Sequence, residues 1–333
     1  MVGGGLCGLS LAHALIADGH DVQVLEGRDR VGGRILTRDG MDLGPAWIWP
    51  GQPRIAALLE RLGQAPLEQY GTGDLLHEDA AGTVQRARGH SGMAGALRVP
   101  GGLGAVTDAL AAQLPSDIVR LGCRVERVEV TDRATRLETS QGRLETERCV
   151  LALPPRLAAD LLPGLDADVL TPMRAVPTWM AGHAKAVATY DHPFWREAGL
   201  SGDAFSRRGP MVELHDASAT DGPAALFGFL GVPPSARQDR PKLEAAILDQ
   251  FTRLFGPDAA QPTTLHLQDW AFDRFTATAA DHQPLYAHPQ YRPLPDPVPG
   301  RILIAGTEMA QTHGGLVEGA LEAAEAAFAR LTE

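Results

Sequence analysis

The sequence predicts an α/β fold that contains a dinucleotide-binding βαβ unit, on three observations. The chain begins MVGGGLCGLS, in which Gly3, Gly5 and Gly8 form a G-x-G-x-x-G loop. Apolar residues at helical spacing follow in LSLAHALIADGH, and the strand-like DVQVLE comes next. Glu26 ends this strand at the spacing where such a unit places the acid that binds the ribose hydroxyls of adenosine. Together these features favour a dinucleotide site over a flexible terminus.

The glycine loop lacks the strand that normally precedes it, because only Met1 and Val2 stand before Gly3. In a doubly wound sheet the first strand is central and buried, so its removal would leave neighbouring backbone groups unpaired. We therefore expect the natural start to lie upstream of Met1. If Met1 is the true start, we expect weak retention of the bound dinucleotide.

The composition is that of a folded protein with two domains or one elaborate domain. Of the 333 residues, 44% are hydrophobic and 21% are charged. The net charge is −11 and neither sign forms long runs, which argues against nucleic acid as a partner. No apolar run approaches the roughly 18 residues that would span a membrane, and the N-terminus does not resemble a signal peptide. We therefore expect a cytoplasmic protein without a membrane anchor. Cys7, Cys123 and Cys149 are odd in number and widely spaced, which predicts free thiols and no metal site.

The order of the remaining elements indicates two interleaved domains. Alternating residues from 119 to 155 predict a meander of strands, broken by Gly142. Strand-like segments and the amphipathic helix PKLEAAILDQFTRLFG follow, and RILIAGTE then VEGALEAAEAAFARL predict a last strand and helix. We expect a Rossmann-like nucleotide-binding domain from residues 1–66, 99–172 and 281–333, and a second domain with a mixed or antiparallel sheet and helices from residues 67–98 and 173–280.

A second glycine motif, GRDRVGGRILT, follows Glu26 directly. Gly32 and Gly33 let the backbone approach a ligand, and Arg34 supplies a cation beside them, which suits a pyrophosphate. Taken alone, this segment would be better explained as a turn between two strands.

With these motifs together, the chain resembles the FAD-dependent flavin amine oxidases, which include monoamine, polyamine and some L-amino-acid oxidases. The resemblance spans nearly the whole chain. It rests on the glycine loop and on E-x-R-x-R-x-G-G-R, here Glu26, Arg28, Arg30 and Gly32–Gly33–Arg34. The other matching segments, in the family's order, are residues 42–55, 99–110, 123–128, 152–155, 183–202 and 305–320. The resemblance implies a Rossmann-like FAD-binding domain and an interleaved substrate domain.

The resemblance also implies which residues contact FAD. The backbone of Val125 would meet the adenine, and Glu308 would accept a hydrogen bond from a ribityl or ribose hydroxyl, unless it is an ordinary acid at a helix start. Val317 would offer its N–H to the C2 carbonyl of the flavin. The full set of expected cofactor-binding residues is Gly3, Gly5, Gly8, Glu26, Arg28, Gly32, Gly33, Arg34, Ala46, Trp47, Val125, Gly306, Glu308, Leu316 and Val317.

Lys185 is the principal catalytic candidate. In the family that the chain resembles, the corresponding lysine holds a water at flavin N5, the atom that accepts hydride. Burial would shift the pKa of Lys185 toward the neutral form, although the alternation in HAKAVATY also permits a place on a solvated face. His313 and Trp270 are further catalytic candidates near the expected flavin, and each could equally be a packing residue.

The sequence departs from the family where many members frame the substrate with two aromatic side chains. Leu316 stands at one of these positions and Ala279 or Ala280 at the other, so we expect no aromatic cage. Ala279 also stands near the cysteine that binds FAD covalently in monoamine oxidases, so FAD is expected to bind non-covalently. The substrate-domain segment before the second Gly-Gly helix start is only residues 67–98, where the family usually has a much longer stretch, which predicts a shallow, open substrate cavity.

The resemblance implies an enzyme that oxidises an amine CH–NH bond by hydride transfer to flavin N5. Oxygen would accept the electrons, giving an imine, then an aldehyde or keto product, and hydrogen peroxide. One alternative is an FAD-dependent desaturase or dehydrogenase that acts on a non-amine substrate with another electron acceptor. A second alternative is a non-catalytic FAD-binding protein. The expected partners are a small-molecule substrate, with an amine as the first candidate, and oxygen or another electron acceptor.

Overall fold

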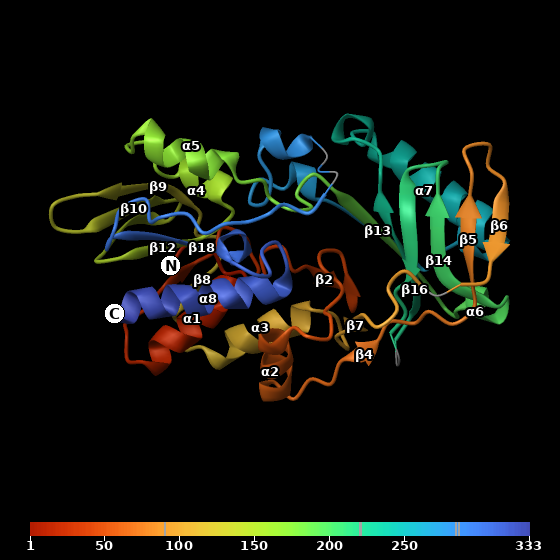
Figure 1. Ribbon diagram of the computed structural model, residues 1–333, viewed down its shortest axis with the longest axis horizontal. Coiled ribbons are helices and arrows are strands. Elements are labelled where there is room, and N and C mark those ends of the chain that lie inside the picture. The colour runs from red at the N-terminus through yellow and green to blue at the C-terminus, as the bar shows by residue number, and fades with distance from the viewer. Residues whose placement is uncertain (90, 220–221, 284, 286) are drawn as a thin grey trace.

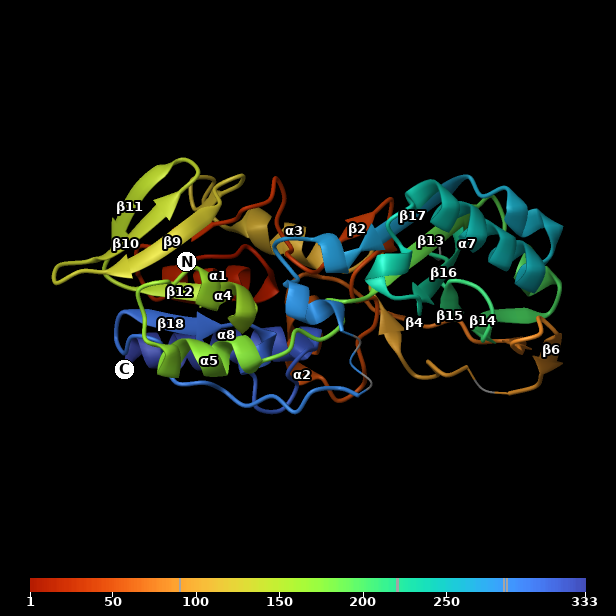
Figure 2. The ribbon, with the colours of Figure 1, turned by 90° about the horizontal axis from the view of Figure 1, so that it is seen from above.

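The computed structural model describes residues 1–89, 91–219, 222–283, 285 and 287–333. The molecule is elongated, with a parallel sheet and its helices at one end and a larger sheet at the other (Figure 1). The view from above shows the same arrangement, with both termini at the parallel-sheet end (Figure 2). Elements from both ends of the chain meet between the two sheets.

The parallel sheet contains four short strands, and the single residue Val2 bridges two of them. β1 (Val24–Leu25) pairs with β8 (Val119–Arg120), and β12 (Cys149–Ala152) pairs with β18 (Ile302–Ala305). Val2 lies between the two pairs and bridges Leu25 and Leu151 in parallel. Met1 and Val2 thus occupy the central place that the sequence analysis assigned to a longer strand.

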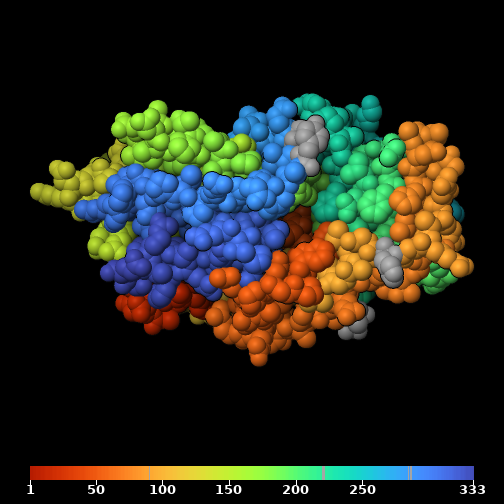
Figure 3. Space-filling model, in the orientation of Figure 1, coloured from red at the N-terminus to blue at the C-terminus, as the bar shows by residue number. Residues whose placement is uncertain are grey.

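Three helices cover this sheet and supply much of its apolar core. α1 (Leu6–Ala17) begins in the glycine loop and packs against α8 (Val317–Thr332) and α3 (Gly104–Gln113). The C-terminal helix also contacts α2 (Pro53–Arg61), where the N–H of Ile55 donates to Glu318 Oε2 at 2.9 Å. In the space-filling view the blue C-terminal segment and the orange segment of α2 adjoin on one face (Figure 3).

The expected meander is confirmed for three strands and differs for a fourth. β9 (Val125–Val130), β10 (Thr135–Thr139) and β11 (Gly142–Thr146) form an antiparallel sheet in the order β11-β10-β9. β12 leaves the meander for the parallel sheet, because its apolar sequence CVLA suits a strand that is covered on both faces. The helices α4 (Pro155–Asp160) and α5 (Ala167–Ala175) follow it.

A seven-stranded mixed sheet forms the other end of the molecule, and α7 (Arg240–Phe255) packs on one of its faces. The strands are antiparallel except for one parallel pair, β14 with β5. Every strand of this sheet comes from residues 74–87 or 184–269. The domain boundaries given in the sequence analysis stay a prediction. In spatial order the strands are β17 (Thr264–Asp269), β13 (Ala184–Tyr190), β16 (Ala224–Leu230), β15 (Met211–Asp216), β14 (Leu200–Ser206), β5 (Asp74–Glu78) and β6 (Val84–Ala87).

The register of this sheet places one row of side chains across its middle strands. Lys185 of β13 is opposite Phe229 of β16, and Phe229 is opposite Glu213 of β15. Alternate residues of β13 pack on α7, whereas Val187 and Phe227 pack against residues of the nucleotide-binding end. The row therefore lies on the sheet face that looks toward the nucleotide-binding loops.

Short elements complete the described structure. Among its helices, none is long and apolar enough to cross a membrane. The small strand pairs are β2 (Thr37–Arg38) with β3 (Met41–Asp42) and β4 (Leu67–Glu68) with β7 (Leu97–Arg98). The remaining helices are α6 (Phe194–Glu197) and the 3-10 turns Pro234–Ala236, Pro257–Ala260, Trp270–Phe272, Ala279–His282 and Thr307–Met309.

Candidate active site

A cavity of about 530 Å³ lies where the nucleotide-binding loops meet the seven-stranded sheet. Its walls come from parts of the chain that are far apart in sequence. The glycine loop, the Gly-Gly-Arg segment and the start of α8 form one part, and β13, β15 and β16 contribute Lys185, Glu213 and Phe229 to another. The cavity thus joins the two sites that the sequence analysis inferred separately.

The glycine loop forms a cradle of backbone N–H groups at one end of the cavity. α1 starts after Gly5 without a side-chain cap and without an acidic residue in its first turn, so its first N–H groups stay available to an anion. A Cβ on Gly8 would lie 2.1 Å from Gly3 O, whereas a Cβ on Gly5 would have no neighbour closer than 3.8 Å. Gly8 therefore allows the tight turn, and Gly5 leaves room for a phosphate group.

Glu26 is held at the same end, close to the glycine loop. It is 3% exposed, and its carboxylate accepts hydrogen bonds from the N–H groups of Gly4 and Arg28, both at 2.8 Å. Each carboxylate oxygen can accept a second hydrogen bond, so capacity remains for the hydroxyls of a ribose. The side chain of Arg28 is itself fixed by Asp273 at 2.6 Å.

Arg34 and Glu308 form a two-point ion pair beside the cradle. Nη1 donates to Oε1 at 2.6 Å and Nη2 donates to Oε2 at 3.0 Å. Arg34 lines the cavity, whereas Glu308 is fully buried and does not reach its wall. The structure therefore places Glu308 behind Arg34, where it fixes the direction of the guanidinium group.

The start of α8 offers a further N–H group. The N–H of Leu316, the N-cap, donates to His313 O at 3.1 Å, whereas that of Val317 has no hydrogen-bond acceptor among the described residues, and both residues line the cavity. The N–H of Val317 suits a carbonyl oxygen of a flavin ring. A cradle of backbone N–H groups, the acid Glu26 and a helix start thus line a single cavity, and this donor set fits FAD.

Lys185 is buried in the middle of the seven-stranded sheet and reaches the cavity wall. It is 2% exposed, and its Nζ donates to Gly44 O at 3.3 Å. The rings of Phe227 and Phe229 lie 4.1 and 5.6 Å from Nζ. Burial lowers the pKa of Lys185 to about 7, against the opposing charge of Asp42. A solvated position for this lysine, which the sequence also permitted, does not fit this environment.

Glu213 is a cavity residue that the sequence analysis missed. Its side chain is 31% exposed, and His215 Nε2 lies 2.8 Å from Oε1. Because Phe229 lies on the strand between them, the Cα atoms of Lys185 and Glu213 are separated by two strand spacings, roughly 10 Å. The sequence did hold a signal for this residue: Glu213 and His215 are two positions apart in MVELHD, which puts two polar side chains on one face of a strand.

The structure brings most of the expected site residues to the cavity and leaves four out. Trp270 lines the wall, and its Nε1 donates to Leu43 O at 2.9 Å. His313 does not line the wall, and its Nδ1 faces Glu322 Oε2 at 3.6 Å. Val125 is likewise outside the wall, in β9. The expected residues on the wall are Gly3, Gly5, Glu26, Arg28, Gly32, Gly33, Arg34, Ala46, Trp47, Lys185, Trp270, Gly306, Leu316 and Val317, and those outside it are Gly8, Val125, Glu308 and His313.

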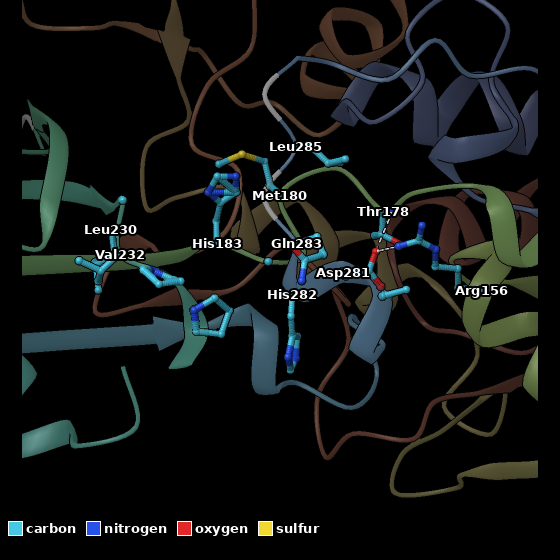
Figure 4. A pocket seen from close by; sticks show the side chains of 15 residues that line it. Arg156, Thr178, Met180, His183, Leu230, Val232, Asp281, His282, Gln283 and Leu285 are labelled. Carbon is cyan, nitrogen blue, oxygen red and sulfur yellow. Dashed lines mark hydrogen bonds and ion pairs between the residues drawn. The ribbon is translucent and has the colours of Figure 1, made fainter. Parts of the chain in front are cut away.

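A second cavity, of about 490 Å³, adjoins the first. Met180 and His183 line both cavities, and Met180 has a left-handed backbone with a φ of 62°. Figure 4 shows this second cavity, where Arg156 and Asp281 form an ion pair on one side. Ala280, which with Ala279 is a candidate for the second aromatic position of the resembled family, lines this second cavity.

Comparison with known proteins adds a family match and similar sequences. A family model described as flavin containing amine oxidoreductase matches residues 6–91 and 78–331. The Mycobacterium tuberculosis protein AofH, provisionally named a flavin-containing monoamine oxidase, is 26% identical over 442 aligned positions, which cover 99% of this chain and 95% of that protein. Putrescine oxidase of Kocuria rosea is 23% identical, with 84% of this chain and 83% of that protein covered.

Solved structures share the fold. A putrescine oxidase structure bound to putrescine has a TM-score of 0.81 and 22% identity, covering 99% of this chain and 98% of that one. Cyclohexylamine oxidase of Brevibacterium oxydans has a TM-score of 0.82 and 21% identity, covering 99% and 97%. The AofH alignment is longer than the 333 residues of this chain, so that relative carries additional segments.

Proposed function

The chain belongs to the flavin-containing amine oxidoreductase family, whose members use FAD to oxidise amines, and we propose that it acts as an oxidase with oxygen as the electron acceptor. The observation that carries the proposal is that one cavity joins the phosphate cradle to the buried amine of Lys185. When bound, FAD supplies the hydride acceptor for the α-carbon of the amine, and the proposed products are an imine, which water hydrolyses, and hydrogen peroxide.

Lys185 is the proposed catalytic residue. Because its pKa is lowered to about 7, both its charged and its neutral form are populated near neutral pH. It can therefore hold a water molecule by a hydrogen bond and exchange a proton with it. A protein that only bound FAD would bear the cost of burying this lysine without using it, which argues against a non-catalytic role.

FAD binding is assigned in this proposal to the expected residues that line the cavity. Gly5 and the N–H groups of α1 would hold the pyrophosphate, Glu26 the adenosine ribose, and Val317 a flavin carbonyl. Trp47 and Trp270 would form an apolar part of the cavity wall. Val125 and His313 are left out of this proposal because the cavity does not reach them.

The cofactor is proposed to bind non-covalently. Cys7 is the cysteine on the cavity wall, and burial raises the pKa of its thiol to about 12. A thiol of that pKa stays protonated and is a poor nucleophile. The other two cysteines of the chain, Cys123 and Cys149, are also buried.

Glu213 favours an amine with a second cationic group. A carboxylate roughly two strand spacings from Lys185 can accept hydrogen bonds from a distal ammonium group, while Phe229 between them suits a methylene chain. A carboxylate on the substrate, as in an amino acid, would be repelled by Glu213. The similarity to putrescine oxidase supports a diamine as the proposed substrate.

One relative bears on the electron acceptor. L-amino acid dehydrogenase of Synechocystis is 28% identical over 68% of this chain and 49% of that protein. Its name raises the alternative that an acceptor other than oxygen reoxidises the reduced enzyme. Slow reoxidation by oxygen would favour that alternative.

Peroxide release in the presence of FAD tests the proposal. We expect the wild type to release hydrogen peroxide with diamines, and Lys185→Met to slow the reaction on the order of a hundredfold. Lys242→Met, at an exposed position on α7, is the matched control and keeps full activity. Absence of peroxide with every amine, from protein that has bound FAD, would contradict the proposed oxidase activity.

A further inference from the structure

Three titratable side chains form a line that ends at the cavity. His215 Nδ1 lies 2.8 Å from Asp203 Oδ1, and His215 Nε2 lies 2.8 Å from Glu213 Oε1. The side chains of Asp203 and His215 are fully buried, whereas that of Glu213 is partly exposed on the cavity wall. The line thus runs from the interior of the sheet to the place where a substrate would bind.

The geometry of this line fixes the protonation of its middle member. A neutral imidazole has one N–H group, and an ionised carboxylate only accepts hydrogen bonds. Since both ring nitrogens of His215 face carboxylate oxygens, both hydrogen bonds form with ionised acids only when the ring is an imidazolium. Burial alone would lower the pKa of His215, but its hydrogen bonds to Asp203 and Glu213 outweigh burial and raise that pKa.

The surrounding residues hold the histidine ring in place. Asp203 and His215 are on the neighbouring strands β14 and β15, whose register is set by the pair Ala204 and Leu214. Trp47 packs edge-on against the ring at a centroid distance of 5.1 Å, and Phe227 packs at 5.4 Å. Apolar rings on the other sides leave the two carboxylates as the ring's hydrogen-bond partners within the described residues.

We propose that Asp203 and His215 are positioning residues that hold the carboxylate of Glu213 in the orientation needed to bind the distal cationic group of a substrate. His215 uses Oε1, and among the described residues no hydrogen bond occupies Oε2 of Glu213. That oxygen is the proposed acceptor for an ammonium group at the end of the substrate remote from the reacting carbon. The inference rests on the proposed amine oxidation and adds two residues that the substrate does not touch.

Each member of the line is needed for this role. Glu213 lies on a partly apolar wall with Phe229 and Trp47, so a hydrogen-bond donor is needed to fix the direction of its carboxylate. The Nε2–H group of the His215 imidazolium is that donor. Without the charge of Asp203, a buried His215 would lose its own positive charge, and its hydrogen bond to Glu213 would no longer be assisted by that charge.

The substitution Asp203→Asn tests the inference with little change of shape. Asparagine can still form a hydrogen bond with Nδ1 through its amide group but carries no charge. We expect kcat/KM for 1,4-diaminobutane to fall on the order of tenfold, mainly through KM, while kcat/KM for butylamine stays unchanged. Glu213→Gln removes the proposed acceptor itself and should lower kcat/KM for the diamine more than for butylamine. Glu78→Gln is the matched control, because Glu78 is a buried acid paired with Arg253 of α7, and it should affect both substrates equally.

Nitrogen-15 NMR of labelled histidine gives a readout that does not depend on turnover. Both ring nitrogens of His215 should carry protons at neutral pH in the wild type, and one should lose its proton in Asp203→Asn. His215→Gln assigns the resonance. A neutral His215 in the wild type, or equal losses for diamine and monoamine in Asp203→Asn, overturns the inference. If no amine is oxidised, the proposed function fails, and the NMR result still decides the state of His215.

Discussion

Arg34 and Glu308 are 274 positions apart in sequence and form an ion pair with contacts of 2.6 and 3.0 Å. The pair joins the Gly-Gly-Arg loop, near the start of the chain, to the turn between β18 and α8, near its end. Both segments contribute to the cavity wall. The wall that we propose holds the cofactor is therefore built from both ends of the chain.

Removal of the charge of Glu308 should weaken both folding and cofactor binding. In Glu308→Gln the guanidinium of Arg34 loses a fully buried partner, and we expect the free energy of unfolding of the apoprotein to fall by about 3 kcal/mol. FAD affinity should fall as well, because Arg34 is no longer fixed. Urea unfolding and flavin fluorescence titration measure the two effects.

Glu78→Gln is a matched control for that variant. Glu78 is also fully buried and pairs with a partly exposed arginine, Arg253, at the far end of the molecule. It should lose similar stability and keep its FAD affinity. Equal FAD affinities in the two variants would contradict the role given to Arg34.

Two glycines of the same loop should respond differently to alanine. Gly8→Ala places a Cβ 2.1 Å from Gly3 O, so we expect severe destabilisation or failure to fold. Gly5→Ala meets no atom within 3.8 Å, and the extended backbone of Gly5, with a φ of −78°, accepts alanine. Apoprotein with Gly5→Ala should melt close to the wild type but bind FAD at least about tenfold more weakly, since the methyl group occupies phosphate space. Unchanged FAD binding in Gly5→Ala would contradict the cradle.

Lys185 should make the stability of the apoprotein depend on pH. Its pKa is lowered from 10.5 to about 7 by burial, so between these values the unfolded chain binds a proton that the folded chain does not. The free energy of unfolding should therefore rise with pH across this window, by up to about 1.4 kcal/mol per pH unit relative to Lys185→Met. Urea unfolding of both proteins at several pH values measures the difference, and parallel curves would mean that Lys185 is not buried as described.

The mode of cofactor attachment is open to a direct test. Acid precipitation should release all the flavin into the supernatant, because the buried thiol of Cys7 stays protonated and Ala279 offers no nucleophile. The yellow colour should stay with the precipitate if the flavin is covalently bound, and that result would contradict non-covalent binding. Free FAD added to denatured protein is the control for recovery.

Local sequence motifs predicted which residues line the nucleotide-loop end of the cavity. The glycine loop, Glu26 and the Gly-Gly-Arg segment act through backbone geometry and short spacing, which a linear sequence records. The strands around Lys185 were also foreseen, because HAKAVATY and AALFGFLGV have strand character.

The substrate half depends on strand register, which the sequence does not display. Glu213, His215 and Asp203 come from two strands in a segment rich in glycine and proline, and their contact appears only when β14 and β15 pair. His313 lies close to the motif that resembles the family, yet it turns toward Glu322 instead of the cavity. Whether a residue reaches the cavity, as Glu213 does and His313 does not, depends on the direction of its side chain, which the sequence does not show.

Anaerobic mixing of the FAD-loaded protein with amines, followed by mixing with oxygen, tests the central claim most directly. The account predicts that 1,4-diaminobutane bleaches the flavin absorbance faster than butylamine, and that oxygen restores it with release of one equivalent of hydrogen peroxide. A flavin that no amine bleaches would contradict amine oxidation by this chain. A flavin that amines bleach but oxygen does not restore would contradict the proposed electron acceptor.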